Sequence, residues 1–238
     1  MLYFLRHGQT AYSKTGGYCG TPENDPGLTA EGIEMAEEFA DVYRSLPWRA
    51  AYVSPLQRAI QTAKPLCEAV GLKLEIRQGL QEIGYGLWEG MHPNDIDRQY
   101  HDLYVRWLTD PAWNAPPNGE RGIDIARRSA AVLEEIEHTH SDGNILIVSH
   151  KATIRIMLCS LMGIDVGRYR DRFEMPVAAV SIVELGSRGP LFHGRNPRRG
   201  LPARGDRSGG HRTRGRGDHR RPAHPIAPQP DSSGGAAR

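Results

Sequence analysis

The sequence predicts an α/β fold: a three-layer sandwich in which a mostly parallel central sheet lies between helices, with a small cap segment added. Two observations support this prediction. Short apolar runs alternate along the chain with longer segments of helical periodicity, an order typical of parallel strands joined by right-handed crossovers. In addition, the runs "LYFL" and "NILIV" are apolar throughout, as expected of central strands that are covered on both faces.

The first strand and the first long helix are predicted near the N-terminus. Residues 2–5 form the strand, and "LTAEGIEMAEEFADVYRSL" follows it with the apolar spacing of a helix. Thr29 is placed to cap this helix. Its inward face is expected to contain Ile33, Ala36, Ala40 and Tyr43.

A second strand and helix come next, as "AAYVS" and "SPLQRAIQTAKPLCEAVG". We expect Ser54 to cap this helix, Pro55 to occupy its first position and Gly71 to end it. The segment "KLEIR" predicts a third strand.

Residues 78–120 are predicted to form the cap. They hold three of the four tryptophans, many turn residues and a short helix around residues 95–108. A helix over residues 123–140 then leads to the strand "NILIVSH" and to the helix "ATIRIMLCSLMG", which Gly163 ends. The segment "VAAVSIVEL" predicts the last strand.

The charge of the chain divides it into two parts. Residues 195–238 hold eleven arginines, no lysine and three aspartates, whereas residues 1–194 hold 19 basic and 25 acidic residues. We therefore expect one domain over 1–194 and a disordered Arg/Gly/Pro-rich tail over 195–238, which has too little apolar surface to form a core. The tail is either a basic arm for an acidic partner or a product of out-of-frame reading; we favour the second, because the composition changes abruptly after "GPLFHG".

The cysteines and the hydropathy of the chain indicate the cellular compartment of the protein. Cys19, Cys67 and Cys159 are widely spaced and form no CxxC pair, which argues against zinc and redox centres and suits a reducing cytoplasm. Cys67 and Cys159 lie at apolar helical positions, whereas Cys19 lies in a loop near the predicted site and is a candidate substrate contact. The chain has no apolar run long enough to cross a membrane and no signal-peptide pattern, so we expect a soluble cytoplasmic protein with no membrane partner.

Two predicted strands each deliver a histidine to the same edge of the sheet. His7 follows "LYFLR" and His150 follows "NILIVS". Arg6 lies beside the first histidine, and Arg58 lies in the first turn of a helix whose N-terminus attracts anions. Because guanidinium groups match phosphate oxygens, these residues predict a pocket for a phosphoryl group on a small-molecule phosphate ester.

The motifs "LRHGQT", "LTAEG", "SPLQRAIQTA", "LQEIGYGLWEG" and "VSHKATIR" resemble those of the histidine phosphatase superfamily, in its order and spacing, over residues 2–193. The resemblance implies a phosphoric monoester hydrolase or a phosphoglycerate mutase. It further implies that His7 is phosphorylated during turnover, that Arg6, Arg58 and His150 bind the phosphate, and that Glu82 donates the proton. It implies no metal and no cofactor.

The chain departs from the family pattern at several positions. Tyr12 and Ser13 stand where Trp-Asn is common, which leaves the Ser13 hydroxyl as a candidate phosphate donor. Lys151 and Ala152 stand where the family usually has two glycines. This change adds a cation beside His150, and it either narrows the pocket or favours a more anionic substrate. Gln9 and Thr10 are either substrate contacts or turn formers.

Three functions compete at this point. We favour a metal-independent phosphomonoesterase, because the cap is shorter than the one that the mutases carry. A cofactor-dependent phosphoglycerate mutase is the first alternative. The second is a non-catalytic adaptor that binds nucleic acid through the basic tail, and the complete catalytic set argues against it. The sequence leaves open the phosphorylated metabolite and whether the protein is a monomer or a homodimer.

Overall fold

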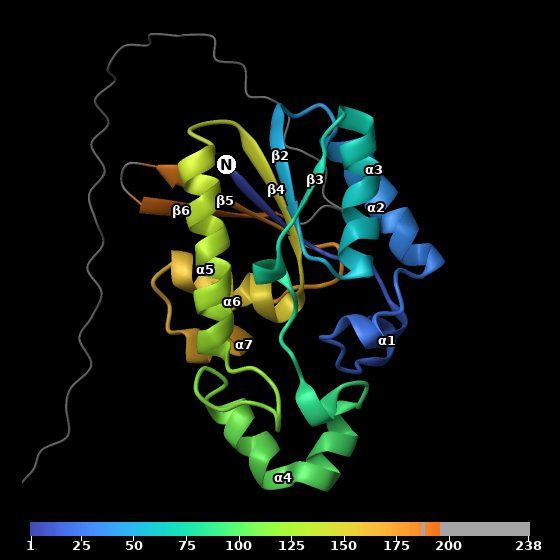
Figure 1. The fold of residues 1–238 in the computed structure, drawn as a ribbon, viewed down its shortest axis with the longest axis vertical. Helices are drawn as coiled ribbons and strands as arrows, with labels where there is room; N and C mark the ends of the chain where they lie inside the picture. Colours follow the sequence, from blue (N-terminus) through green and yellow to red (C-terminus); the bar gives the residue numbers. More distant parts are fainter. Residues whose placement is uncertain (187–188, 196–238) are drawn as a thin grey trace, which may run out of the picture. The chain divides into compact units, whose positions relative to one another are not determined.

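A six-stranded sheet forms the centre of the computed structural model, which describes residues 1–186 and 189–195. The strand order is β3-β2-β4-β1-β5-β6 (Figure 1). The strands are β1 (Leu2–Arg6), β2 (Trp48–Val53), β3 (Leu74–Ile76), β4 (Asn144–Ser149), β5 (Val180–Gly186) and β6 (Gly189–Arg195). The first four pair in parallel, and β5 and β6 are antiparallel to their neighbours, so the predicted α/β class with a mostly parallel sheet is confirmed.

The register of the central strands brings their C-terminal ends to one edge. Arg6 of β1 pairs with Ser149 of β4, and Val53 of β2 pairs with Val148 of β4. The residues that follow β1, β2 and β4 therefore leave the sheet at the same edge. The amide of His7 still donates to the Ser149 carbonyl at 3.1 Å, so His7 and His150 begin side by side.

Helices cover both faces of the sheet (Figure 1). On one face α2 (Ala30–Tyr43) and α3 (Gln57–Val70) pack against side chains such as Leu5 and Val148. On the other face α5 (Gly122–Thr139) and α6 (Lys151–Leu161) pack against side chains such as Phe4 and Ile147. Each fully buried Leu, Ile or Phe of these two layers stabilises the fold by about 1.5–3 kcal/mol relative to exposure.

The inward face of α2 differs from the prediction at one position. Ile33 is 45% exposed, and the buried residues are Gly32, Ala36, Phe39, Ala40 and Tyr43. The reason lies in Gly32, whose backbone packs directly on the loop at Gln9 and so turns the next residue to solvent. The predicted N-cap of α2 is confirmed, because the Thr29 hydroxyl accepts a hydrogen bond from the Gly32 amide at 3.1 Å.

The start of α3 also differs from the prediction. The helix begins at Gln57 with Leu56 as its N-cap, so Ser54 and Pro55 lie before it. Ser54 is instead directed to the edge of the sheet, where its hydroxyl meets His150 Nε2 at 2.6 Å. Gly71 ends α3 with a φ of 72°, as predicted.

The predicted cap has an aromatic core of its own. It contains the single turns η2 (Gln78–Leu80) and η3 (Gly86–Trp88) and the helix α4 (Pro93–Thr109), which is kinked at Tyr100. Trp88 and Trp107 are fully buried and meet edge to face at 5.6 Å between ring centroids. Both pack in one cluster with residues of α6, which joins the cap to the sheet domain.

Short elements complete the described part of the chain. They are α1 (Ala11–Thr15), η1 (Pro22–Asn24), η4 (Val166–Arg168) and α7 (Tyr169–Arg172). The C-terminal strand predicted over 177–185 is observed as β5, and the antiparallel strand β6 is added to it. The sequence of β6 contains Pro190 and two glycines, so it lacks the residue pattern typical of a strand. A proline is tolerated in β6 because β6 lies at the edge of the sheet.

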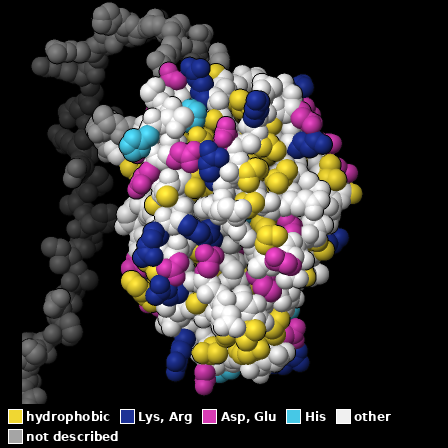
Figure 2. Space-filling model, in the orientation of Figure 1, with side chains coloured by type: hydrophobic (Ala, Val, Ile, Leu, Met, Phe, Trp, Pro, Cys, Tyr) yellow, Lys and Arg dark blue, Asp and Glu magenta, His cyan; other side chains and the backbone are white. Residues whose placement is uncertain are grey.

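The surface of the cap carries exposed apolar side chains. Leu103, Val105 and Leu108 of α4 are each at least 40% exposed. Figure 2 shows hydrophobic side chains gathered at the lower end of this face, where Figure 1 places α4. None of the described helices combines the length and apolar character needed to cross a membrane. Residues 196–238 lie outside the described part, so the tail and the boundary at residue 194 stay predictions.

Gly32→Ala should destabilise the protein although alanine is the better helix former. A Cβ at Gly32 would lie 2.2 Å from the Gln9 carbonyl oxygen, which is backbone and cannot move aside cheaply. We expect the free energy of unfolding to fall by about 1–3 kcal/mol, measured by urea denaturation. Glu37→Ala on the exposed side of the same helix is the control, expected within about 0.5 kcal/mol of the parent. A Gly32→Ala variant as stable as the parent would contradict the close approach.

Candidate active site

The imidazole of His7 is buried, with its proton held on Nδ1. The Gly8 carbonyl oxygen lies 2.8 Å from Nδ1, and a carbonyl can only accept, so Nδ1 carries the hydrogen and Nε2 has a free lone pair. Burial, and after it the charges of Arg6 and Arg58, holds the pKa of His7 well below its usual value. His7 is therefore neutral at physiological pH, with an unprotonated Nε2.

The backbone at Gly8 packs directly against α2 and α3. A Cβ at Gly8 would lie 2.5 Å from the Gly32 carbonyl oxygen of α2. The Gly8 amide donates to Thr62 Oγ1 of α3 at 2.9 Å. These two contacts fix the loop that presents His7.

His150 lies beside His7 with the opposite tautomer. The two ring centroids are 5.2 Å apart. Arg58 Nε donates to His150 Nδ1 at 3.2 Å, so the ring proton is on Nε2 and is directed to Ser54 Oγ at 2.6 Å. Burial, then the charges of Arg58 and His7, lowers the pKa of His150 well below its usual value.

Arg58 is buried and paired with an aspartate that the sequence analysis missed. Its Nη1 lies 3.1 Å from Asp25 Oδ1, and both side chains are 3% exposed. The backbone amide of Arg58 also donates to Asp25 Oδ2 at 3.3 Å. The only sequence signal for this pair is an aspartate in the turn-rich "PENDPG", which by itself indicates a loop.

Cys19 contacts Arg58 through both its backbone and its side chain. Arg58 Nη2 donates to the Cys19 carbonyl at 2.9 Å, and Nη1 lies 3.5 Å from the sulfur. Burial raises the pKa of the Cys19 thiol to about 11, so the thiol stays protonated at physiological pH. Cys19 thus helps to hold the arginine, and its contact with substrate stays a prediction.

Arg6 is less fully satisfied than Arg58. Its Nη1 donates to the Met175 carbonyl at 2.6 Å, whereas its buried Nε has no hydrogen-bond partner among the described residues. Burial lowers the pKa of Arg6 to about 10, with the nearby charge of Glu82 opposing the shift. The guanidinium is still charged at neutral pH and has donor capacity to spare.

Glu82 is buried against the N-terminus of α6, directly after His150. Its carboxyl oxygens accept from the amides of Ala152 and Thr153, each at 3.2 Å. The Thr153 hydroxyl lies 3.3 Å from Glu82 and donates its hydrogen to the Gln81 carbonyl at 2.7 Å. Glu82 also accepts from the Ile83 amide at 3.0 Å. These backbone amides hold the carboxyl group of Glu82 at the N-terminus of α6.

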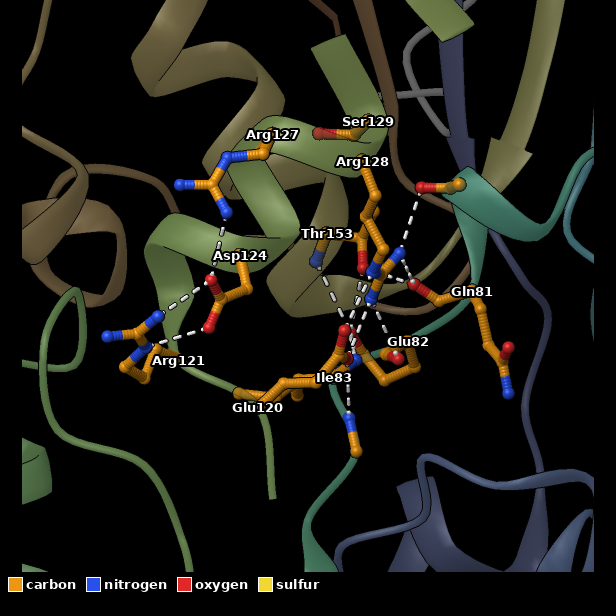
Figure 3. Close-up of polar contacts among 12 residues, drawn as sticks. Gln81, Glu82, Ile83, Glu120, Arg121, Asp124, Arg127, Arg128, Ser129 and Thr153 are labelled. Carbon is orange, nitrogen blue, oxygen red and sulfur yellow. Dashed lines mark hydrogen bonds and ion pairs between the residues drawn. The ribbon is translucent and has the colours of Figure 1, made fainter. Parts of the chain in front are cut away.

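Arg128 and Glu120 bind the backbone of the segment around Glu82 (Figure 3). Arg128, on α5, donates to the carbonyls of Gly79, Gln81 and Glu82 at 2.8–3.1 Å. It also makes a two-point ion pair with Glu120, with both contacts at 3.0 Å. Glu120 in turn accepts from the Gly84 amide at 3.0 Å. The sequence pattern gave no reason to separate this pair from solvent-exposed helix charges.

The other predicted site residues make structural contacts in the loop after His7. Thr10 and Ser13 form the capping box of α1, with hydrogen bonds of 3.1 and 2.8 Å. The Gln9 amide donates to Glu31 at 2.9 Å and accepts from Thr29 at 3.0 Å. The structure therefore brings His7, Arg58 and His150 together, whereas phosphate contacts of Gln9, Thr10 and Ser13 stay predictions.

The model of the histidine phosphatase superfamily (branch 1) matches residues 2–197. The chain belongs to this superfamily. It is 28% identical over 187 residues to phosphoserine phosphatase 1 of Hydrogenobacter thermophilus, which covers 79% of this chain and 87% of the relative. Family membership and such relatives support a phosphatase hydrolase.

Solved structures of superfamily members are similar to this fold. The α-ribazole phosphatase from Shigella flexneri has a TM-score of 0.75 and 25% identity, covering 85% of this chain and 98% of that one. A mycobacterial glucosyl-3-phosphoglycerate phosphatase in complex with VO3 has a TM-score of 0.72 and 28% identity, covering 81% and 96%.

The two histidines should show opposite tautomers in the ligand-free protein. At pH 6.5, where an ordinary histidine is half protonated, His7 and His150 should both be neutral, with protons on Nδ1 and Nε2 respectively. Long-range ¹H–¹⁵N NMR of the imidazole nitrogens distinguishes these states. An imidazolium signal for either residue, or the same tautomer in both, would contradict the contacts described.

Proposed function

We propose that the protein is a metal-independent phosphomonoesterase that hydrolyses a small phosphorylated metabolite through a phosphohistidine on His7. The observation that carries the proposal is the state of His7, a buried neutral imidazole whose Nε2 is unprotonated beside two arginines. Such a nitrogen is a nucleophile at neutral pH without activation by a metal. Phosphoserine and glucosyl-3-phosphoglycerate, which the names of relatives give as substrates, are phosphate monoesters and are candidates here.

In the first step Nε2 attacks phosphorus in line. The N–P bond forms, the ester P–O bond breaks and the alkoxide takes a proton from Glu82. Arg6 and Arg58 meet the charge on the phosphoryl oxygens, a role in which removing one preorganised donor typically slows a reaction by about 100-fold to 1000-fold. The amides of Ile83, Ala152 and Thr153 fix the position of the Glu82 carboxyl group for this transfer.

In the second step water hydrolyses the phosphohistidine. Glu82, now a carboxylate, takes a proton from the water as its oxygen bonds to phosphorus. The N–P bond breaks, inorganic phosphate leaves and neutral His7 is restored.

His150 is the proposed third phosphate ligand. In the ligand-free state its Nδ1 accepts from Arg58 and its Nε2 proton is directed to Ser54. Burial lowers the pKa of His150 most, and a bound phosphoryl dianion offsets the positive charges that lower it further. Substrate binding thus favours the protonated ring, which gains a second N–H to donate.

His7→Ala should abolish turnover and the covalent intermediate. We expect a loss of at least about 10⁴-fold in kcat, because the substitution removes the attacking nitrogen. Acid-labile, base-stable labelling with a radiolabelled substrate measures the intermediate. His138→Ala, at an exposed histidine of α5, is the control and should label like the parent. Labelling that persists in His7→Ala would contradict the assignment of the nucleophile.

Glu82→Gln should affect substrates according to their leaving group. We expect about 100-fold slower hydrolysis of an alkyl phosphate such as phosphoserine, but less than about tenfold for p-nitrophenyl phosphate, whose leaving group needs little protonation. The two rates are compared in one preparation, so that any loss of α6 capping affects both equally. Equal losses would show that Glu82 acts only by holding α6.

Product analysis separates the phosphatase from the mutase. Given 3-phosphoglycerate and a bisphosphoglycerate primer, with and without chelator, the protein should release inorganic phosphate and accumulate no 2-phosphoglycerate. Efficient isomerisation would establish the mutase. No turnover of any phosphate monoester, with tight polyanion binding, would favour the adaptor.

A further inference from the structure

We infer that Lys151, Arg155 and Arg170, here called the cationic cluster, form a subsite for a second anionic group of the substrate. The inference rests on the function proposed above and narrows its substrate class to phosphate monoesters that carry another negative charge, a carboxylate or a second phosphate.

Two members of the cationic cluster share one face of α6. Lys151 is the first residue of this helix and follows His150 directly, and Arg155 lies one turn later. Residues four apart lie on the same side of a helix, so the two cations are neighbours. The catalytic edge of the sheet therefore continues into a cationic helix face.

Arg170 approaches the same region from α7, which contacts α6. Its guanidinium lies 4.3 Å from the ring centroid of Trp107, which is buried in the cap. Trp107 meets Tyr18 and Tyr85 edge to face, at 5.8 and 6.3 Å between centroids. These rings hold Arg170 in place without neutralising its charge.

The cationic cluster has no carboxylate partner among the described residues. Within residues 1–186 and 189–195 no ion pair joins any of its members to a carboxylate, whereas Arg58 and Arg128 each have one and Arg77 has two. The buried Nε of Arg155 has no hydrogen-bond partner among these residues, as is also true of Arg6 Nε. Glu82 is the carboxyl group that acts on both Lys151 and Arg155, and backbone amides already bind its oxygens.

Electrostatics supports the same arrangement. Burial, and then the charges of Arg155, Arg6 and Arg170, lowers the pKa of Lys151. Burial and Arg170 likewise lower the pKa of Arg155. The cations are thus close enough to repel one another, and Arg6 connects them to the phosphoryl site. A site with this excess charge gains most from a ligand that brings more charge than one phosphate.

The test compares substrates that differ in the second anionic group alone. Phosphoserine and phosphoethanolamine differ by a carboxylate, and fructose 1,6-bisphosphate and fructose 6-phosphate differ by a phosphate. We expect kcat/KM of the parent to favour the more anionic member of at least one pair by about tenfold or more, and the pair concerned identifies the group.

Lys151→Met and Arg155→Met are the informative variants. Each should reduce that preference at least threefold, mainly by raising KM for the more anionic substrate, while circular dichroism shows a folded protein. Lys64→Met, at an exposed lysine of α3, removes the same charge elsewhere and should leave the preference unchanged.

Two results would overturn the inference. A parent enzyme without preference in either pair shows that no second anion is bound, while the proposed phosphatase function stands. A preference that survives in both Lys151→Met and Arg155→Met shows that other residues bind the anion. Failure of the proposed function is distinct from these results, because the parent would then hydrolyse neither these substrates nor p-nitrophenyl phosphate.

Discussion

The neutral state of His7 is the constraint on which the rest of the site depends. A nucleophilic imidazole needs a free lone pair, yet phosphate binding needs positive charge close by. The structure meets both needs, because burial lowers the pKa of His7 and Arg6 and Arg58, which lower it further, are also the groups proposed to bind the phosphoryl oxygens. The Gly8 carbonyl then decides which nitrogen stays free.

The distribution of charge around His7 is uneven. Arg58 is neutralised by the buried Asp25, and Glu82 is bound to the N-terminus of α6. Arg6 and the cationic cluster have no such partners among the described residues. The site therefore contains several positive charges without a carboxylate partner among the described residues, an arrangement that attracts a multiply charged anion.

The fold and the two histidines could be predicted because their signals are local. The apolar runs of β1 and β4 and the histidines after them need only a few residues to recognise, and the parallel pairing of these strands brings His7 and His150 together. Asp25 could not be predicted, because its partner Arg58 is 33 residues away and no pattern links a loop aspartate to a helix arginine. The residue type of Ser54 predicts a helix cap, yet tertiary contact with His150 decides its place. Arg128 and Glu120 likewise depend on backbone carbonyls that only the folded chain brings within reach.

The most direct test of the central claim is a crystal structure of the protein with orthovanadate, which adopts the geometry of a transferring phosphoryl group. The account predicts a vanadium atom bonded to Nε2 of His7, with its oxygens bound by Arg6, Arg58 and His150. Vanadate bonded to another residue or to Nδ1 of His7 would contradict it, as would vanadate bound away from His7 altogether.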